Sequence, residues 1–355
     1  MAEADDYFER LVDTEKLRAF LEDELGPTDV YEVERHEGGN SNETLTVEWG
    51  DREFIIRRPP PGETADTAHD VLREYRVMSA LQDTDVPLPE TIVGCDDHDV
   101  IGSDFYVMER VPGDVPRAGV PERFQSPEGR RKFGEELVDT LAKINQVDVE
   151  AVGLEDFGYP DGYTERQVDR WHEQLEWAFE VTREEREVPA LDRVGEWLAD
   201  NTPEEYPHTL VHGDYKHDNV MFAPGTPPRL NAVLDWEMST LGDPFFDLGW
   251  MLSYWRDAKD PEPVMPELVT RFMEHEDFPT RKELVARWEE RTGFDYDNDR
   301  FYRTLAVYKL AGLGEMFFRR HLEGNADNPM YPKMRERVPA LAERAERIIE
   351  GEQPL

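Results

Sequence analysis

The segment from Leu210 to Trp250 constrains this chain more than any other, because it alternates short apolar runs with polar residues that suit a reactive site. It reads LVHGDYKHDNVMFAPGTPPRLNAVLDWEMSTLGDPFFDLGW. Two apolar runs, Val220–Phe222 and Ala232–Leu234, flank a turn rich in proline and glycine, a pattern that predicts two strands joined by a turn. Such a hairpin would gather three polar side chains at one end: Asp214, Asn219 and Asp235.

Two carboxylates and an amide are hard oxygen donors, which suit Mg²⁺ and a proton acceptor better than zinc or iron. In a kinase catalytic loop an aspartate serves as the base, an asparagine five residues later binds metal, and a second metal-binding aspartate follows. Here Asp214 and Asn219 keep that offset, and Asp235 lies 21 residues after Asp214. A single aspartate means little in an acidic chain, but the ordered set, with His212 and Gly213 in register, is not expected by chance.

The motif resembles that of the aminoglycoside phosphotransferase family of small-molecule kinases. His-Gly-Asp at 212–214 stands where protein kinases have His-Arg-Asp, and Asp-Trp-Glu at 235–237 stands where they have Asp-Phe-Gly. The run GDPFFDLGW resembles the segment that closes the motif in that family. The resemblance covers nearly the whole chain and implies an α+β, two-lobed, protein-kinase-like fold. Its N-lobe would be small and rich in β-strands, and its C-lobe large and mainly helical.

Glycines precede the first predicted hairpin of the N-lobe, whose strands alternate over residues 45–49 and 54–57. A glycine-containing turn between strands allows backbone N–H groups to approach phosphate closely. An ordinary hairpin turn has the same composition. The resemblance to kinases, which cover the nucleotide phosphates in this way, makes Gly39, Ser41 and Asn42 candidate phosphate-binding residues.

Arg57 occupies the position where kinases carry a strand lysine on the α- and β-phosphates. This is a departure from the kinase pattern, although a guanidinium group binds phosphate well and can do so bidentately. Arg58 would point to the opposite face of the strand. Glu74 lies on the apolar stripe of a helix predicted over residues 65–81, where a carboxylate needs a partner. We expect Arg57 to be that partner, as in the lysine–glutamate pair of kinases; the alternative is a solvated helix-edge glutamate.

The run Arg-Arg-Pro-Pro at 57–60 resembles that of one subfamily, found as the kinase-like part of acyl-CoA dehydrogenase fusion proteins. The predicted domain organisation is an N-terminal nucleotide-binding lobe over residues 1–108, a hinge over 109–114 and a catalytic and acceptor-binding lobe over 115–355. Backbone groups of Glu109 and Val111 in the hinge would meet the adenine of the nucleotide. Helical spacing predicts helices beginning at Phe8, at Ser126-Pro127, and over 301–320 and 333–349.

Other polar and aromatic residues near the motif are assigned structural roles. We expect His212 to be structural, Asp243 to cap a helix and Asp247 to brace the catalytic loop. The aromatic-rich segment 171–179 could line an acceptor pocket, but such a stripe is more often core. No acceptor-binding residues are therefore assigned.

The chain of 355 residues carries 80 acidic and 40 basic residues, a formal net charge of −40. Such a charge repels nucleic acid and anionic membranes, so neither is an expected partner. Acid-rich surfaces with few lysines (8 here) resemble those of proteins from salt-loving organisms, where screening removes the self-repulsion. The alternative is an acidic surface that meets a basic partner, but the acids are spread along the whole chain.

Sequence features also predict the cellular compartment. Cys95 is the only cysteine, which excludes an intrachain disulfide and a cysteine-based metal cluster. The acidic start lacks the apolar core of a signal peptide, and no run of 18 apolar residues predicts a membrane span. We therefore expect a soluble, cytoplasmic protein. The sequence does not indicate an oligomeric state.

The resemblance implies a phosphotransferase that uses ATP and Mg²⁺ to phosphorylate a hydroxyl of a small molecule. Asp214 would be the catalytic base, and Asn219 and Asp235 would bind Mg²⁺. The subfamily points to a hydroxyacyl-CoA or a related metabolite as acceptor, with aminoglycoside, homoserine, choline and sugar acceptors also open, and with GTP as a second possible donor. The rival hypothesis is a nucleotide-binding pseudokinase that acts as a regulatory scaffold, which the missing strand lysine favours.

Overall fold

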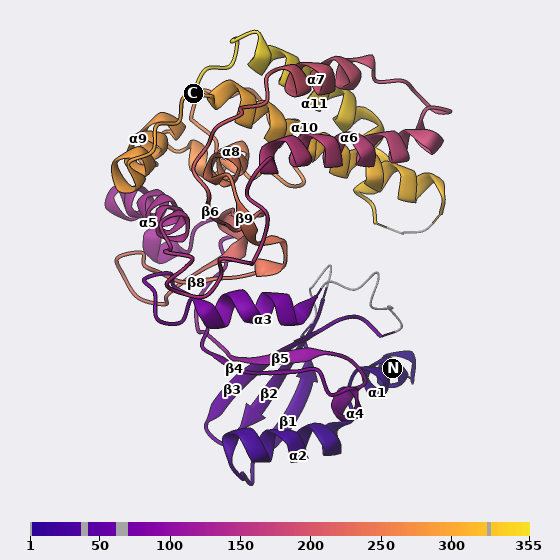
Figure 1. Cartoon of the computed structure of the whole chain (residues 1–355), viewed down its shortest axis with the longest axis vertical. Helices are drawn as coiled ribbons and strands as arrows, with labels where there is room; N and C mark the ends of the chain where they lie inside the picture. The colour runs from indigo at the N-terminus through magenta and orange to yellow at the C-terminus, as the bar shows by residue number, and fades with distance from the viewer. Residues whose placement is uncertain (1, 37–41, 62–69, 325–327) are drawn as a thin grey trace.

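The computed structural model describes residues 2–36, 42–61, 70–324 and 328–355. Figure 1 shows two lobes: an N-terminal lobe built on one sheet, and a larger, mainly helical C-terminal lobe. This arrangement confirms the predicted α+β, kinase-like architecture. The predicted Gly39 and Ser41 lie outside the described residues.

The N-terminal lobe is organised around a five-stranded sheet in which every neighbouring pair is antiparallel, in the order β1-β2-β3-β5-β4. The strands are β1 (Tyr31–Arg35), β2 (Glu43–Trp49), β3 (Arg52–Arg58), β4 (Thr91–Cys95) and β5 (Phe105–Glu109). The predicted hairpin is the β2–β3 pair, with Val47 opposite Phe54. Alternate residues of these strands are fully buried, as the sequence alternation predicts.

Helices cover both faces of this sheet (Figure 1). One face packs with α2 (Thr14–Leu25) through Leu17 and Leu21. The opposite face carries α3 (Val71–Ala80), whose Met78 shares a core with Tyr106 of β5 and with the C-terminal lobe. Helix α3 therefore connects the two lobes, which places Glu74 between them.

Two predicted elements of the N-terminal lobe were wrong in their limits. The single helix expected from Phe8 is two helices, α1 (Ala2–Leu11) and α2, because Asp13 accepts a hydrogen bond from Lys16 N–H and caps the second. The apolar run from Ile101 to Met108, which the sequence predicts as one strand, is a strand only from Phe105. Ile101 ends the short helix α4 (His98–Ile101), since Asp97 caps that turn and Gly102 ends it. The helix predicted over 65–81 is described only from Val71 onward.

Helices dominate the C-terminal lobe. They are α5 (Pro127–Asn145), α6 (Tyr163–Thr182), α7 (Pro189–Asp200), α8 (Pro244–Tyr254), α9 (Arg281–Thr292), α10 (Asp299–Leu322) and α11 (Met334–Ile349). Ser126 caps α5 through its hydrogen bond from Gly129 N–H, as predicted. Helix α10 is buried on nearly all sides, which explains why its charged residues need internal partners. None of the helices in the described part of the chain is long and apolar enough to span a membrane.

Two short β-ladders carry the polar motif between the helices. Strand β7 (Val220–Phe222) pairs with β8 (Leu230–Val233), which is the hairpin predicted from the sequence. Strand β6 (Thr209–Val211) pairs instead with β9 (Thr240–Gly242), a pairing that the sequence analysis did not predict. The four strands bring the loop after β6, the start of β7 and the end of β8 to one place.

The segment predicted as a hinge leaves β5 at Glu109 and is fastened to this motif at its far end. Asp114 and Phe222 exchange two backbone hydrogen bonds, of 2.9 and 3.0 Å. Asn231 Nδ2 adds a hydrogen bond to the carbonyl of Pro112 at 2.9 Å. The segment that joins the lobes is therefore held against the β7–β8 hairpin.

Candidate active site

Asp214 lies in the loop after β6, and hydrogen bonds hold both of its carboxylate oxygens. Trp250 Nε1 donates to Oδ1 at 2.7 Å, while Lys216 Nζ and Asn219 Nδ2 donate to Oδ2 at 2.6 and 2.9 Å. Burial alone would raise the pKa of Asp214, but Lys216 and Lys309 outweigh burial and lower that pKa below its usual value. Asp214 is therefore an oriented carboxylate at neutral pH, and its side chain stays 26% exposed.

Backbone geometry fixes the loop that presents Asp214. Gly213 has φ +82°, a conformation that side-chain-bearing residues rarely adopt. A Cβ there would also clash with the carbonyl of Met238, 2.6 Å away. Asp247 accepts hydrogen bonds from the N–H groups of His212 (2.6 Å) and Gly213 (2.8 Å). Burial raises the pKa of Asp247 to about 7 against these donors. Asp247 braces the loop, in agreement with the role expected for it.

His212 is fully buried and connects the loop to the end of β8. Its Nδ1 accepts the N–H of Asp214 at 3.3 Å, so its Nε2, 2.9 Å from the carbonyl of Leu234, must be the protonated nitrogen. Burial lowers the pKa of His212. A neutral, doubly hydrogen-bonded imidazole supports the expected structural role.

Lys309 supports the same loop from α10, and the sequence analysis missed it. Its ammonium is buried, donates to the carbonyl of Gly213 at 2.9 Å and lies 3.9 Å from the centroid of the Trp250 ring. Burial lowers the pKa of Lys309 to about 8, although Asp214 opposes the shift. The available signal was a lone lysine inside the apolar run LAVYKLAGLG at 305–314.

Asn219 and Asp235 meet beside Asp214, as the hairpin predicts. Leu234 N–H donates to the carbonyl of Asn219 at 2.9 Å, which ties the start of β7 to the end of β8. Among the residues that the structure describes, Asp235 is the only non-glycine residue with positive φ, at 65°. Such a conformation costs about 1–3 kcal/mol and is found mainly where function requires it.

These two side chains fit a magnesium ion shared with phosphates. Asn219 Nδ2 donates to Asp214, which leaves Asn219 Oδ1 as an acceptor. Asp235 Oδ1 accepts a hydrogen bond from Arg57 Nη2 at 3.3 Å. Within the described ranges no three histidine, cysteine or acidic side chains are arranged to hold a metal by themselves. Mg²⁺ characteristically takes one or two protein oxygens and completes its shell with phosphate and water, so this donor set fits it.

Arg57 uses all three of its guanidinium nitrogens. Nε lies 3.7 Å from Glu74 Oε2, Nη2 lies 3.3 Å from Asp235 Oδ1, and Nη1 lies 3.3 Å from Thr44 Oγ1. Burial acts to lower the pKa of Arg57, but Glu74 outweighs it and the pKa is raised. Glu74 is itself buried and accepts the N–H of Trp236 at 3.1 Å. The expected Arg57–Glu74 pair is present, and it also reaches the residue after Asp235.

Arg58 points to the other face of β3, as the alternation predicts. It is buried and donates to the carbonyls of Leu11 and Ile101. Asn42 is also buried, at the lobe boundary, with Nδ2 3.5 Å from Glu237 Oε2. Its Oδ1 has no hydrogen-bond partner in the described part of the chain. Asn42 therefore contacts the segment that follows Asp235 and keeps one free acceptor there.

The backbone at Glu109 and Val111 meets only part of the expectation for adenine binding. Glu109 N–H already donates to the carbonyl of Glu90 at 2.8 Å, and the N–H of Arg110 donates to Glu53. The N–H of Val111 makes no hydrogen bond to any described residue. The Glu109 N–H is therefore already engaged, while the Val111 N–H remains available.

Comparison with known proteins gives this geometry a family. Residues 32–284 match the model of the phosphotransferase enzyme family. A crystal structure from Ralstonia eutropha JMP134, assigned to the aminoglycoside phosphotransferases, superposes with a TM-score of 0.80 at 31% identity, over 96% of this chain and 99% of the other. The GDP and kanamycin complex of APH(2″)-IIIa has a TM-score of 0.63 at 13% identity, over 92% and 98% of the two chains, a likeness of fold alone.

Sequence relatives include acyl-CoA dehydrogenase family member 11 of Rattus norvegicus. It is 34% identical over 301 residues, which cover 83% of this chain and 37% of the rat protein. Family member 10 of Mus musculus is 31% identical over 333 residues, which cover 93% of this chain and 30% of the mouse protein. The chain thus spans about a third of the length of these relatives. Because the family model covers most of this chain and includes Arg57, Asp214, Asn219 and Asp235, the chain belongs to the phosphotransferase enzyme family.

Proposed function

We propose that the protein transfers the γ-phosphoryl group of ATP, as its magnesium complex, to a hydroxyl group of a small molecule. The observation that carries this proposal is the convergence of an oriented base, two oxygen ligands and a paired arginine at the lobe boundary. The residues are Asp214, Asn219, Asp235 and Arg57. Asn219 donates to Asp214, its carbonyl accepts the N–H of Leu234 beside Asp235, and Asp235 accepts from Arg57.

Asp214 would orient the acceptor hydroxyl and take its proton. As that oxygen forms its bond to the γ-phosphorus, the bond between the γ-phosphorus and the bridging β–γ oxygen breaks and ADP leaves. Trp250 and Lys216 hold the carboxylate during this step. Transfer of this kind depends on positioning and on neutralising charge, which rigid hydrogen bonds supply in advance.

The phosphates would be held by the ion ligands and by Arg57. When bound, Mg²⁺ neutralises the phosphate oxygens and aligns them for displacement. Asn219 Oδ1 and the Asp235 carboxylate would hold it. To meet the α- and β-phosphates, Arg57 would exchange its contact with Asp235 for phosphate oxygens, while Glu74 keeps the guanidinium in place.

A cavity near the motif supports an acceptor with a negatively charged end. It measures about 420 Å³ and is lined by Arg73 and Arg166, by aromatic residues including Tyr163, and by Thr240. Thr240 pairs with Val211, three residues before Asp214. The lining also includes Asp156, whose carboxylate is paired with Arg76. The two arginines of the lining therefore favour an anion over an aminoglycoside polycation. The names of the sequence relatives make hydroxyacyl-CoA thioesters the first acceptors to test.

Phosphoryl transfer to a panel of hydroxyacyl-CoAs and kanamycin, with ATP or GTP as donor, tests the proposal. Asp214→Asn should lose transfer by about 10³-fold or more while nucleotide binding, read as a magnesium-dependent thermal shift in molar KCl, survives. Asp51→Asn, in the exposed β2–β3 turn, is the matched control and should keep both. Nucleotide binding without transfer in the wild type would favour the pseudokinase. A folded protein that shows no shift at millimolar nucleotide would overturn the site itself.

A further inference from the structure

A second charged cavity lies in the C-terminal lobe, apart from the proposed active site. It measures about 60 Å³ and is lined by Arg256 just after α8, the segment 260–264, the start of α9, α11, and Gln353 beyond α11. Its lining includes four arginines and two carboxylates: Arg256, Arg281, Arg344, Arg347, Asp260 and Glu262. The cavity therefore holds a surplus of two positive charges, in a chain whose net charge is strongly negative.

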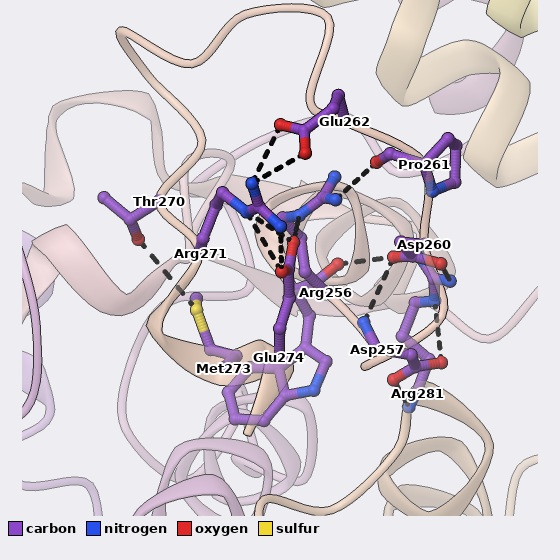
Figure 2. A network of polar contacts seen from close by, with 11 residues as sticks. Arg256, Asp257, Asp260, Pro261, Glu262, Thr270, Arg271, Met273, Glu274 and Arg281 are labelled. Atoms are coloured by element: carbon purple, nitrogen blue, oxygen red, sulfur yellow. Dashed lines mark hydrogen bonds and ion pairs between the residues drawn. The ribbon is translucent and has the colours of Figure 1, made fainter. Parts of the chain in front are cut away.

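Both carboxylates of the lining are already engaged (Figure 2). Asp260 Oδ1 accepts from Arg281 Nη2 at 2.6 Å, and Glu262 accepts from Arg271 Nη1 at 2.8 Å. Arg256 is paired with Glu274 at 2.6 Å, outside the lining. These carboxylates are therefore paired with arginines outside α11, and none of them pairs with the arginines of α11.

The outer wall carries two arginines without a partner. Arg344 and Arg347 lie three residues apart on α11, so their side chains share one face of the helix. Both are partly buried, and neither side chain makes a hydrogen bond or an ion pair with any residue that the structure describes. Burial, together with Arg281 and Arg303, lowers the pKa of Arg344 to about 10. A guanidinium held among like charges is unfavourable unless an anion joins it.

We propose that this cavity binds a small tetrahedral oxyanion of the phosphate or sulfate type. The ion would accept hydrogen bonds from Arg344 and Arg347, with the ion-paired Arg281 and Arg256 forming the wall behind it. Guanidinium forks match such oxygens bidentately, and the guanidinium groups of Arg344 and Arg347, unpaired within the described part of the chain, supply the positive charge. A volume several times that needed for one water admits the ion. The bound ion would tie α11 to the loop between α8 and α9. This site is independent of phosphoryl transfer.

Thermal unfolding with inorganic phosphate or sulfate as the probe tests the site. The anion is titrated from 0 to 50 mM in 2 M KCl, so that ionic strength barely changes. Specific binding raises the midpoint by a few degrees and saturates, whereas stabilisation by ion exclusion grows linearly with concentration. A midpoint that rises only linearly with the anion concentration overturns the proposal. A midpoint that does not change also overturns it, and is the result expected if chloride fills the cavity.

Arg344→Gln identifies the cavity as the source of the shift. In this variant the saturable shift should disappear, and the midpoint without phosphate should rise, because the repulsion from Arg281 and Arg303 is relieved. Arg335→Gln removes the same charge from an exposed position on α11 and should keep the shift. Arg347→Gln repeats the test if Arg344→Gln does not fold. An equal saturable shift in the cavity variants and in Arg335→Gln would refute the assignment.

Discussion

The indole N–H of Trp250 donates a 2.7 Å hydrogen bond to Oδ1 of Asp214. The same indole ring makes a cation–π contact with Lys309, whose ammonium lies 3.9 Å from the ring centroid. That ammonium also lies 2.9 Å from the carbonyl of Gly213. Helices α8 and α10 thus both hold the loop of the proposed base. The base is oriented by the C-terminal helices as well as by its own motif.

Trp250→Phe should lower kcat by about 10- to 100-fold, because a hydrogen bond to a charged group is worth about 1.5–3 kcal/mol and phenylalanine keeps the ring but not the donor. The Kd for ATP should stay within about twofold, since Trp250 contacts Asp214, Lys309 and Tyr254 rather than Arg57 or Asp235. Steady-state kinetics and a nucleotide titration measure the two effects. Trp177→Phe, at a partly exposed position on α6, is the matched control. An unchanged kcat in Trp250→Phe would show that the bond does not orient Asp214 during transfer.

Lys309→Met should change how stability depends on pH. The pKa of Lys309 is about 8 in the folded protein and near its ordinary value of about 10.4 when unfolded. Between these values the unfolded chain binds more protons, so this lysine makes the free energy of unfolding rise with pH. Below about pH 8 both states carry the proton and the contribution is constant.

The difference in unfolding free energy between wild type and Lys309→Met should therefore move in favour of the wild type from pH 8 to pH 10. Urea unfolding at fixed KCl, at pH 7, 8, 9 and 10, measures it. Lys282→Met, at an exposed position on α9, controls for the loss of one charge. A difference that stays flat across this range would mean that Lys309 titrates at its ordinary pKa.

The sequence predicted the parts of the site that local spacing determines. Asp214 and Asn219 lie five residues apart on one loop, and the β7–β8 turn returns Asp235 to them, so pattern alone suffices. Arg57 and Glu74 were paired by combining strand alternation with the kinase resemblance. Lys309 was missed because it meets Gly213 across 96 positions, and only the packing of α10 against α8 decides that contact. The break at Asp13 was missed because leucines continue on both sides of it with helical spacing.

Arg57→Lys should weaken ATP binding by about 10-fold, although lysine is the residue that kinases use at this place. Arg57 contacts Glu74, Asp235 and Thr44 through three different nitrogens. The single ammonium group of a shorter lysine side chain cannot make all three contacts. The Kd for ATP with Mg²⁺, measured by thermal shift or calorimetry, reports the loss. Arg52→Lys, at the exposed start of β3, is the control. A Kd equal to that of the wild type would indicate that this site needs only a positive charge here.

Stability should rise steeply with KCl between 0.1 and 1 M. The folded chain confines a net charge of −40, and the distance over which charges interact falls from about 10 Å at 0.1 M to about 3 Å at 1 M. The unfolded chain spreads the same charge over a larger volume, so screening favours the folded state. Because charge screening is nearly complete at 1 M, the thermal midpoint should rise less per mole of salt from 1 to 3 M, where only ion exclusion continues to act. A midpoint that is flat below 1 M would mean that the acids are already neutralised by arginine pairs, and the interpretation of this surface as adapted to salt would be wrong.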